Sequence, residues 1–286
     1  MDPRFSVIIP SYNRAGTIGR AIEAAKHQSF PPYEIIIADD GSTDGTSNLI
    51  SSYPSIVYLF QENKGVTSAR NLGASVAKGK WLVFLDSDDT VKESWLMNFK
   101  NAIRGFPGCQ VFQMGYELIF AGSGKNKVFL PSQSKYLPPL TGTFAIKKDL
   151  FFSLGGYDEA LRFGENSELF FRLEKMNESI QKIETADLIY QESHDGGSKN
   201  LRNMNDSIRH TLVKHQDYLS PKVKRLYHQI AGVNYLRLGD YRQASQDLRK
   251  AFLLQPWKLD TLVRWGISKF PFLAKKIYPI KSSLNG

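Results

Sequence analysis

The chain has 286 residues, a hydrophobic content of 42% and a formal net charge of +9. These values suit one large α/β domain, or one domain with a small appendage, and they exclude disordered and collagen-like chains. No run approaches the roughly 18 apolar residues that a transmembrane helix needs, and the lone Cys109 excludes an intramolecular disulfide. Because the first strand-like run begins at Phe5, we expect no signal peptide and a cytoplasmic protein.

The first half of the chain alternates between short apolar runs and segments with helical spacing. Strands are predicted at 5–9, where Pro10 stops the run, and at 35–38, 56–60 and 81–85. Helices are predicted at 18–25, from a cap at Ser42 or Thr43 through Ser51, and at 66–77. This alternation favours an open, largely parallel sheet with helices on both faces.

The second half of the chain is less regular. Strands are predicted at 111–120 and 128–130, and helices at 148–154 and 165–176. From about residue 205 onward the pattern predicts only helices. We therefore expect a domain over residues 1–200 and a helical region over residues 201–286.

Acidic and polar residues follow several predicted strands. Asn13, Asp39 and Asp40 come after the first two strands, and Asp86-Ser87-Asp88-Asp89 follows the fourth. Ligands bind where the carboxyl ends of parallel strands meet, and carboxylate oxygens suit Mg²⁺ or Mn²⁺ that also binds substrate phosphates. No P-loop or dinucleotide fingerprint is present, so the pattern predicts a site for a metal and a nucleoside diphosphate. A solvated acidic loop or a helix cap is the alternative.

Four motifs together resemble the family 2 glycosyltransferases of the GT-A fold. They are SVIIPSYNR at 6–14, IIIADDGSTDGT at 35–46, NKGVTSARNLG at 63–73 and WLVFLDSDD at 81–89. With GGYDEALRFGENSELFFRL the resemblance covers roughly residues 4–200. It implies an α/β fold with an open mixed sheet flanked by helices, to which the sequence adds a small all-α C-terminal region. It also implies inverting, metal-assisted transfer of a sugar from a nucleotide-diphosphate sugar, expected to be a UDP-sugar, to a hydroxyl of a glycan or lipid-linked acceptor.

The resemblance also assigns residues to the donor. The turn with Pro10, Tyr12 and Asn13 would hold the base and ribose together with Asp39, which would accept from the base's imide N–H. Arg70 would support the base or the diphosphate, with an ordinary helix-surface ion pair as the alternative.

Further residues are assigned by the same resemblance to the metal and to catalysis. Asp86 would contact the ribose, Asp88 would bind Mn²⁺ or Mg²⁺, and His194 would complete the metal's ligands or be an ordinary loop residue. The base in similar enzymes is the aspartate of a Glu-Asp pair, where this sequence has Glu165 and Asn166. Asparagine cannot accept a proton near neutral pH, so either Glu165 takes that role or activity is impaired.

The C-terminal third carries most of the positive charge. Residues 1–190 contain 20 Lys and Arg against 21 Asp and Glu, whereas residues 191–286 contain 17 against 7. Residues 232–256 resemble one tetratricopeptide hairpin, which would dock on the catalytic domain, a partner or a second subunit. Basic and apolar residues alternate over 262–286, which predicts peripheral contact with the inner face of the cell membrane. A closing helix is the alternative, and no nucleic-acid module is recognisable.

Two other functions remain open from the sequence. One is a glycosyltransferase-like adaptor, which Asn166 favours and which the retained Asp39, Asp86 and Asp88 oppose. The other is a nucleotidyltransferase, which would need a Gly-rich basic phosphate loop that residues 10–13 do not provide.

Overall fold

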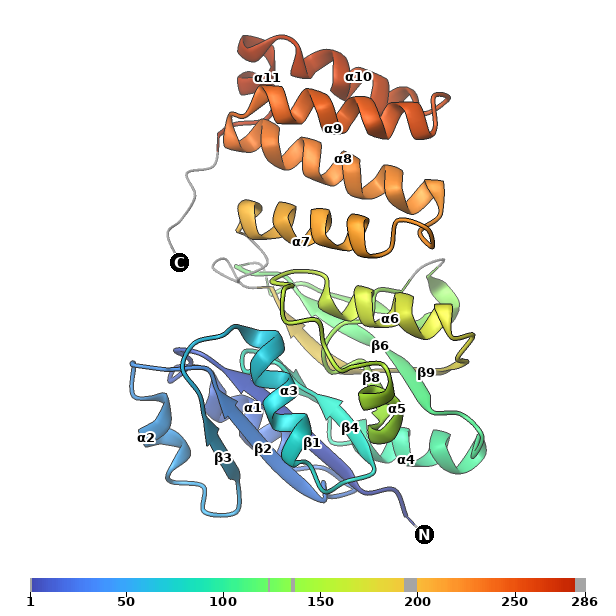
Figure 1. Ribbon diagram of the computed structural model, residues 1–286. Helices are drawn as coiled ribbons and strands as arrows, with labels where there is room; N and C mark the ends of the chain where they lie inside the picture. The colour runs from blue at the N-terminus through green and yellow to red at the C-terminus, as the bar shows by residue number, and fades with distance from the viewer. Residues whose placement is uncertain (1, 123, 135–136, 193–199, 281–286) are drawn as a thin grey trace. The chain divides into compact units, whose positions relative to one another are not determined.

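The computed structural model describes residues 2–122, 124–134, 137–192 and 200–280 (Figure 1). The chain divides into two compact units. Unit 1 comprises Met1–Glu159 and Glu165–His194, and unit 2 comprises Ala160–Gly164 and Asp195–Gly286.

Unit 1 is built on one mixed sheet. Its strands are β1 (Phe5–Ser11), β2 (Glu34–Asp39), β3 (Val57–Phe60), β4 (Trp81–Phe84), β5 (Thr90–Val91), β6 (Val111–Ile119), β7 (Asn126–Phe129), β8 (Phe144–Lys147) and β9 (Ile180–Gln191). The order is β3-β2-β1-β4-β8-β6-β9-β5, with β7 paired to β6. The first four strands are parallel neighbours, whereas β8 runs antiparallel to both β4 and β6. The expected open mixed sheet is confirmed.

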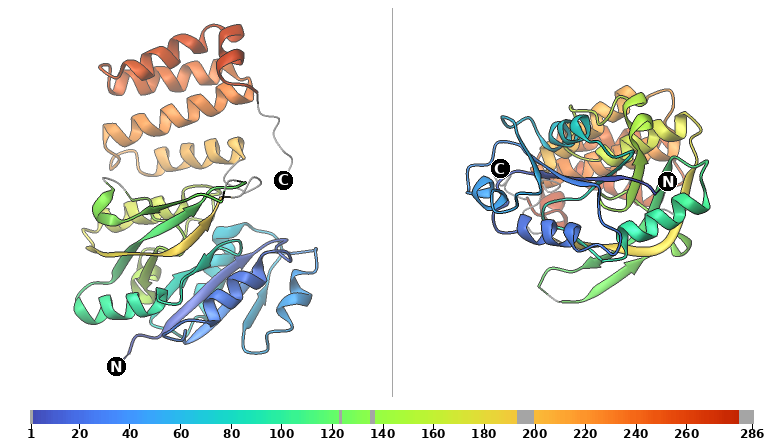
Figure 2. Two further views of the ribbon diagram at one scale, coloured as in Figure 1. Left: turned by 180° about the vertical axis from the view of Figure 1, so that it is seen from behind. Right: turned by 90° about the horizontal axis from the view of Figure 1, so that it is seen from below.

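Helices cover both faces of this sheet. They are α1 (Ile18–Lys26), α2 (Thr46–Ile50), α3 (Val66–Val76), α4 (Trp95–Gly105), α5 (Lys148–Ser153) and α6 (Glu165–Lys175), with a short 3₁₀ turn at Pro131–Gln133. Successive strand residues point to opposite faces, so Val7 packs in a core with α1 and α4, and Ile8 packs in a second core with α3, α5 and α6. In Figure 1 α3 lies in front of the strands, and in the reverse view of Figure 2 α1 does.

The chain order along the sheet changes direction between β1 and β4. From β1 the chain first builds outward to β2 and β3, and then returns to add β4 on the other side of β1. At such a change of direction the loops that follow two adjacent strands run to opposite sides and leave a crevice between them. Ligands of α/β proteins commonly bind in this crevice. The loops after β1 and β4 carry Asn13, Asp86 and Asp88.

Two local predictions are wrong. Strand β1 continues through Pro10 to Ser11. The Ser11 carbonyl points toward β2 and accepts from the Asp40 N–H. The backbone nitrogen of Pro10 therefore points to the opposite side, toward β4. Pairing with β4 has already ended at Ile8, so the missing N–H of proline costs no hydrogen bond of the sheet. Helix α2 begins at Thr46 rather than after Ser42 or Thr43, because the Asp44 carboxylate accepts from the Thr46 N–H at 3.1 Å.

Unit 2 contains five helices within the described residues. They are α7 (Leu201–Lys214), α8 (Pro221–Leu238), α9 (Tyr241–Leu254), α10 (Leu259–Ser268) and α11 (Pro271–Ile277). Helices α8 and α9 form the expected hairpin, in which a Cβ at Gly232 would lie 2.6 Å from Leu248 Cγ. Glycine therefore allows the two helices to approach closely. Among the described helices of the chain, none is long and apolar enough to cross a membrane.

Candidate active site

The turn after β1 is tied to the turn after β2 by Asn13. Its backbone N–H donates to Ser42 Oγ at 2.9 Å, and its side-chain Oδ1 accepts from the Thr43 N–H at 2.8 Å. Asn13 has a φ of 51°, a left-handed conformation that asparagine tolerates better than most residues. The side chain of Asn13 therefore fixes the relative position of two strand ends. In the same turn Pro10 is buried, whereas 48% of Tyr12 is exposed.

The two aspartates at the end of β2 have different surroundings. Asp39 is fully buried and accepts from the Ser42 N–H at 2.8 Å and from the Tyr58 hydroxyl at 2.8 Å. Burial and the bond to Asp39 raise the pKa of Tyr58 to about 12. Asp40 accepts from the Lys64 and Gly65 N–H groups, so it holds the loop before α3. The expectation that Asp40 joins the other acids in one site is wrong.

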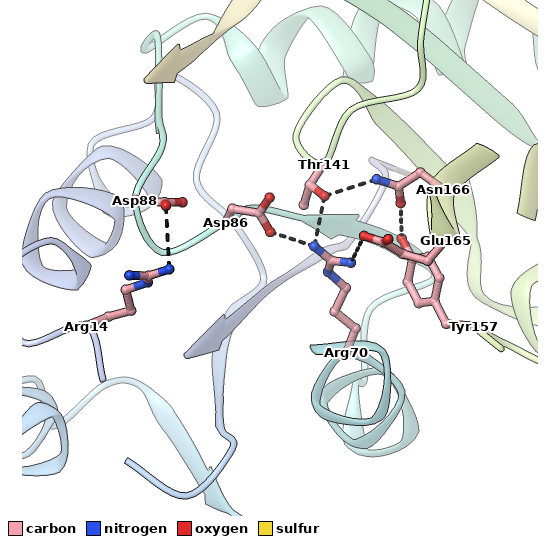
Figure 3. Close-up of polar contacts among 8 residues, drawn as sticks. All are labelled: Arg14, Arg70, Asp86, Asp88, Thr141, Tyr157, Glu165 and Asn166. Atoms are coloured by element: carbon pink, nitrogen blue, oxygen red, sulfur yellow. Dashed lines mark hydrogen bonds and ion pairs between the residues drawn. The ribbon is translucent and has the colours of Figure 1, made fainter. Parts of the chain in front are cut away.

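Acidic side chains gather in the loop that follows β4. Burial and the negative charge of Asp86 raise the pKa values of Asp88 and Asp89. Asp89 is buried and accepts from the Gln191 N–H at 2.9 Å, which ties this loop to the end of β9. Asp88 is partly exposed and lies 3.8 Å from Arg14 (Figure 3). Arg14 and Arg20 oppose this effect at Asp88, but burial and the Asp86 charge outweigh them, so the pKa of Asp88 stays raised.

Arg70 joins the acidic loop to the start of α6. Its Nη2 donates to Asp86 Oδ1 at 2.7 Å, and its Nη1 donates to Glu165 Oε1 at 2.7 Å (Figure 3). Burial opposes the charged guanidinium, but the carboxylates of Asp86 and Glu165 outweigh it, so the pKa of Arg70 is raised. With only 3% of its side chain exposed, Arg70 is a buried bridge between two carboxylates, and the surface ion pair considered from the sequence is wrong.

Asn166 lies beside this bridge and is hydrogen-bonded through both ends of its amide. Its Oδ1 accepts from the Tyr157 hydroxyl at 2.8 Å, and its Nδ2 donates to Thr141 Oγ1 at 3.1 Å. Thr141 Oγ1 also accepts from Arg70 at 3.0 Å. Burial, despite the nearby Arg70 charge, raises the pKa of Tyr157, so this hydroxyl stays protonated and donates. Asn166 thus holds Thr141 and Tyr157 in place around Arg70.

The structure therefore brings together most of the predicted catalytic and metal-binding residues. Asp86, Arg70, Glu165 and Asn166 form one connected group, and Asp88 lies in the same loop as Asp86 (Figure 3). His194 lies outside the described residues. Sequence reasoning missed Thr141 and Tyr157. Tyr157 belongs to the GGYDEALRFGENSELFFRL motif, which was the available signal for it, whereas no motif given above includes Thr141.

The carboxylates after β4 would supply only part of the ligands of a divalent cation, and substrate would have to supply the others. Within the described ranges no group of three or more His, Cys, Asp or Glu side chains is placed to hold a metal ion. Mg²⁺ and similar cations commonly bind one or two carboxylates and take their other ligands from phosphates and water. Burial and the charge of Asp86 raise the pKa values of Asp88 and Asp89, and a cation bound beside them would neutralise these closely spaced negative charges.

Comparison with known sequences agrees with this arrangement. The sequence profile described as Glycosyl transferase family 2 matches residues 6–135. An uncharacterised glycosyltransferase of Rickettsia typhi is 30% identical over 215 residues, which are 70% of this chain and 67% of that protein. The chain belongs to glycosyl transferase family 2. The succinoglycan biosynthesis protein ExoO of Rhizobium meliloti, also 30% identical, matches over 59% of this chain and 51% of its own length.

Solved structures show the same fold. The crystal structure of S. aureus TarS 1–349 in complex with UDP-GlcNAc has a TM-score of 0.65 at 18% identity, covering 94% of this chain and 91% of that chain. The GT-A fold expected from the sequence is thereby confirmed. The matched part of the chain spans about half to two thirds of the length of four curated relatives and less than half of four others.

Proposed function

We propose that this protein transfers a sugar from a UDP-sugar to a hydroxyl of a glycan or lipid-linked acceptor, with inversion at the anomeric carbon. The observation that carries the proposal is the Asp86–Arg70–Glu165 bridge, which joins the β4 loop to the start of α6. The bridge connects Asp86, a carboxylate expected on the donor side, to Glu165, the candidate base. The structural neighbour TarS 1–349 has been crystallised with UDP-GlcNAc and with UDP, which supports a uridine donor.

In the proposed reaction the acceptor oxygen attacks the anomeric carbon while the bond to the nucleoside diphosphate breaks. The acceptor proton passes to Glu165, whose Oε1 is held by Arg70 and whose Oε2 has no partner within the described part of the chain. Glu165 has 14% of its side chain exposed, so it remains accessible to a proton on an acceptor. Asn166 orients the surrounding groups and takes no proton.

The donor side of the reaction would use the carboxylates after β4. Asp88, with Asp86 beside it, would hold Mn²⁺ or Mg²⁺, and a cation there would stabilise the charge on the departing diphosphate. Asp39 accepts two hydrogen bonds from its own chain and is fully buried, so it would accept from a uracil N–H only after the turns around it open.

The test is donor binding followed by turnover. UDP-GlcNAc and other nucleotide-diphosphate sugars, each with and without Mn²⁺, should raise the melting temperature, because a ligand at 100 times its Kd adds about 2.7 kcal/mol to native-state stability. Release of UDP with an added glycan acceptor then measures transfer. Absence of stabilisation by every donor, with and without metal, would contradict the proposal.

Binding without turnover would favour a second candidate, a family member that has lost catalysis and serves as an adaptor. The neutral Asn166 and the engagement of Glu165 by Arg70 are the observations that favour it. A nucleotidyltransferase would instead release pyrophosphate from a nucleoside triphosphate. Measuring pyrophosphate and UDP in parallel distinguishes the two chemistries.

A further inference from the structure

Helices α10 and α11 and the residues that flank them expose an unusual number of large apolar side chains. Phe272 has 88% of its surface exposed, and Trp257 and Leu259 each have 69% exposed. The other exposed apolar residues of this segment are Leu262, Val263, Phe270, Leu273, Ile277 and Ile280. We call residues 257–280 the terminal face. Large apolar side chains exposed in such number within one segment indicate an interaction site.

The apolar residues of α10 are arranged along one side of the helix. Leu259, Leu262 and Val263 follow the spacing of a single helical stripe, and all three are exposed. The opposite side of α10 faces unit 2, since Thr261 is fully buried and Trp265 stacks on Phe252 of α9. One side of α10 therefore packs against the rest of unit 2, whereas the stripe on the other side stays exposed.

Basic residues surround this apolar stripe. Lys258, Lys269, Lys275 and Lys276 are exposed, and Arg264 is partly exposed. Asp260 is the sole acidic residue in 257–280, and it accepts a hydrogen bond from Gln229 of α8 at 3.1 Å. The face thus combines apolar and aromatic side chains with a net positive charge.

The combination of apolar and basic side chains favours an anionic membrane over a second copy of the chain. A second copy joined through the same face would bring two sets of lysines together, and like charges oppose such a dimer. In an anionic bilayer Phe272 and the leucines can insert among the upper parts of the lipid chains. The long lysine side chains can reach the negatively charged headgroups. Each basic residue near such a surface adds to binding.

We propose that the terminal face attaches the protein peripherally to an anionic phospholipid membrane. Phe270, Phe272 and Leu273 enter the interfacial layer, and Lys275 and Lys276 contact phosphate headgroups. The attachment is independent of glycosyl transfer, because every residue involved lies in unit 2 and none belongs to the candidate active site.

The test is co-sedimentation of the full chain with vesicles. Vesicles of phosphatidylglycerol and phosphatidylcholine in equal parts should bind the protein, and vesicles of phosphatidylcholine alone should bind it much less. Replacing both lysines, as Lys275→Gln with Lys276→Gln, should weaken binding about 30-fold, since each contributes a factor of roughly five. Phe272→Ser should weaken it about tenfold or more. Raising NaCl from about 0.1 M to about 1 M should release the protein, because the Debye length falls from about 10 to about 3 Å.

Matched variants in unit 1 control for charge and for loss of an aromatic ring. Lys78→Gln with Lys80→Gln removes the same charge from exposed positions, and Phe106→Ser removes an aromatic side chain that is 49% exposed. Both controls should bind as the unaltered protein does. Circular dichroism verifies that each variant is folded.

Three results would overturn the proposal. The first is equal binding to neutral and anionic vesicles, and the second is equal loss of binding in the control variants. The third is light scattering that shows an oligomer which Phe272→Ser converts to a monomer, without vesicle binding by either form. That result would assign the terminal face to a second copy of the chain.

Discussion

Arg70 and Glu165 are 95 positions apart in the sequence, yet a guanidinium nitrogen of Arg70 lies 2.7 Å from a carboxylate oxygen of Glu165. The same guanidinium contacts Asp86 at 2.7 Å. One buried cation therefore sets the distance between the loop after β4 and the first turn of α6. Shifts of either element would separate the donor-side acids from the candidate base.

Replacing Arg70 should destabilise unit 1 strongly. Arg70→Met leaves the carboxylates of Asp86 and Glu165 without their shared cation, and removing one partner of a buried ion pair costs about 3–5 kcal/mol. Arg70→Lys should cost less but still more than a surface change, because one ammonium cannot reproduce two directed contacts. Urea denaturation measures both. The control is Arg104→Lys at an exposed pair with Asp2, where a loss similar to that of Arg70→Lys would contradict the buried-bridge interpretation.

Glu165→Gln should lower kcat by about 100-fold or more while leaving the Kd for the donor nearly unchanged, because general base catalysis contributes that much. The amide keeps an oxygen that can accept from Arg70, so folding is largely preserved. Single-turnover transfer and donor titration provide the two measurements. Turnover close to that of the unaltered enzyme would remove Glu165 from the base role.

Asn166→Asp tests whether the asparagine limits the reaction. With Glu165 as base, a new carboxylate at 166 should give no increase in rate, and it loses the Nδ2 donor to Thr141. The same transfer assay decides the point. A large gain in kcat would instead show that the natural chain is catalytically impaired at this position.

Asp88→Asn should separate stability from function. Removing one negative charge relieves repulsion with Asp86, so the melting temperature without metal should rise slightly or stay the same. Donor binding in Mn²⁺ should weaken, and addition of EDTA should affect the variant less than the unaltered protein. If EDTA changes donor binding by both proteins equally, Asp88 is not a metal ligand.

The Tyr58–Asp39 bond should contribute stability that depends on pH. Burial and this bond raise the pKa of Tyr58 from 10.0 to about 12, so the folded protein holds the proton more tightly than the unfolded chain. The contribution is complete below pH 10 and is lost as the pH rises through about 12. The difference in unfolding free energy between the unaltered protein and Tyr58→Phe should therefore shrink across that window. Tyr33→Phe, at an exposed tyrosine of the same unit, should show no such trend.

Gly232→Ala tests the packing of the helical hairpin in unit 2. The added methyl would lie 2.6 Å from Leu248 Cγ and 3.3 Å from the Ala244 carbonyl oxygen, and overpacking of this kind costs about 1–3 kcal/mol. Gly266→Ala in α10 meets no atom within 4 Å, so it should stabilise by up to about 1 kcal/mol. Thermal unfolding of both variants gives the comparison, and equal effects would contradict the close approach of α8 and α9.

Several elements escaped prediction for a common reason. Strand β8 is four residues long, β5 is two, and both pair with strands distant in the sequence. Strand β9 is twelve residues long, but half of its residues are polar, and its register against β6 shifts on both sides of Gly115. Their stability comes from long-range pairing, which local periodicity does not contain.

The sequence by itself determined the alternating strands and helices, the two-sided core and the acids after β2 and β4, because periodicity and the shared edge of parallel strands depend on local order. The tertiary structure alone decided which acids meet. It turned Asp40 toward the loop before α3, placed Arg70 between Asp86 and Glu165, and completed the surroundings of Asn166 with Thr141 and Tyr157. Hydrogen bonds and ion pairs act over about 3 Å, so partners far apart in the chain are selected only when packing brings them into contact.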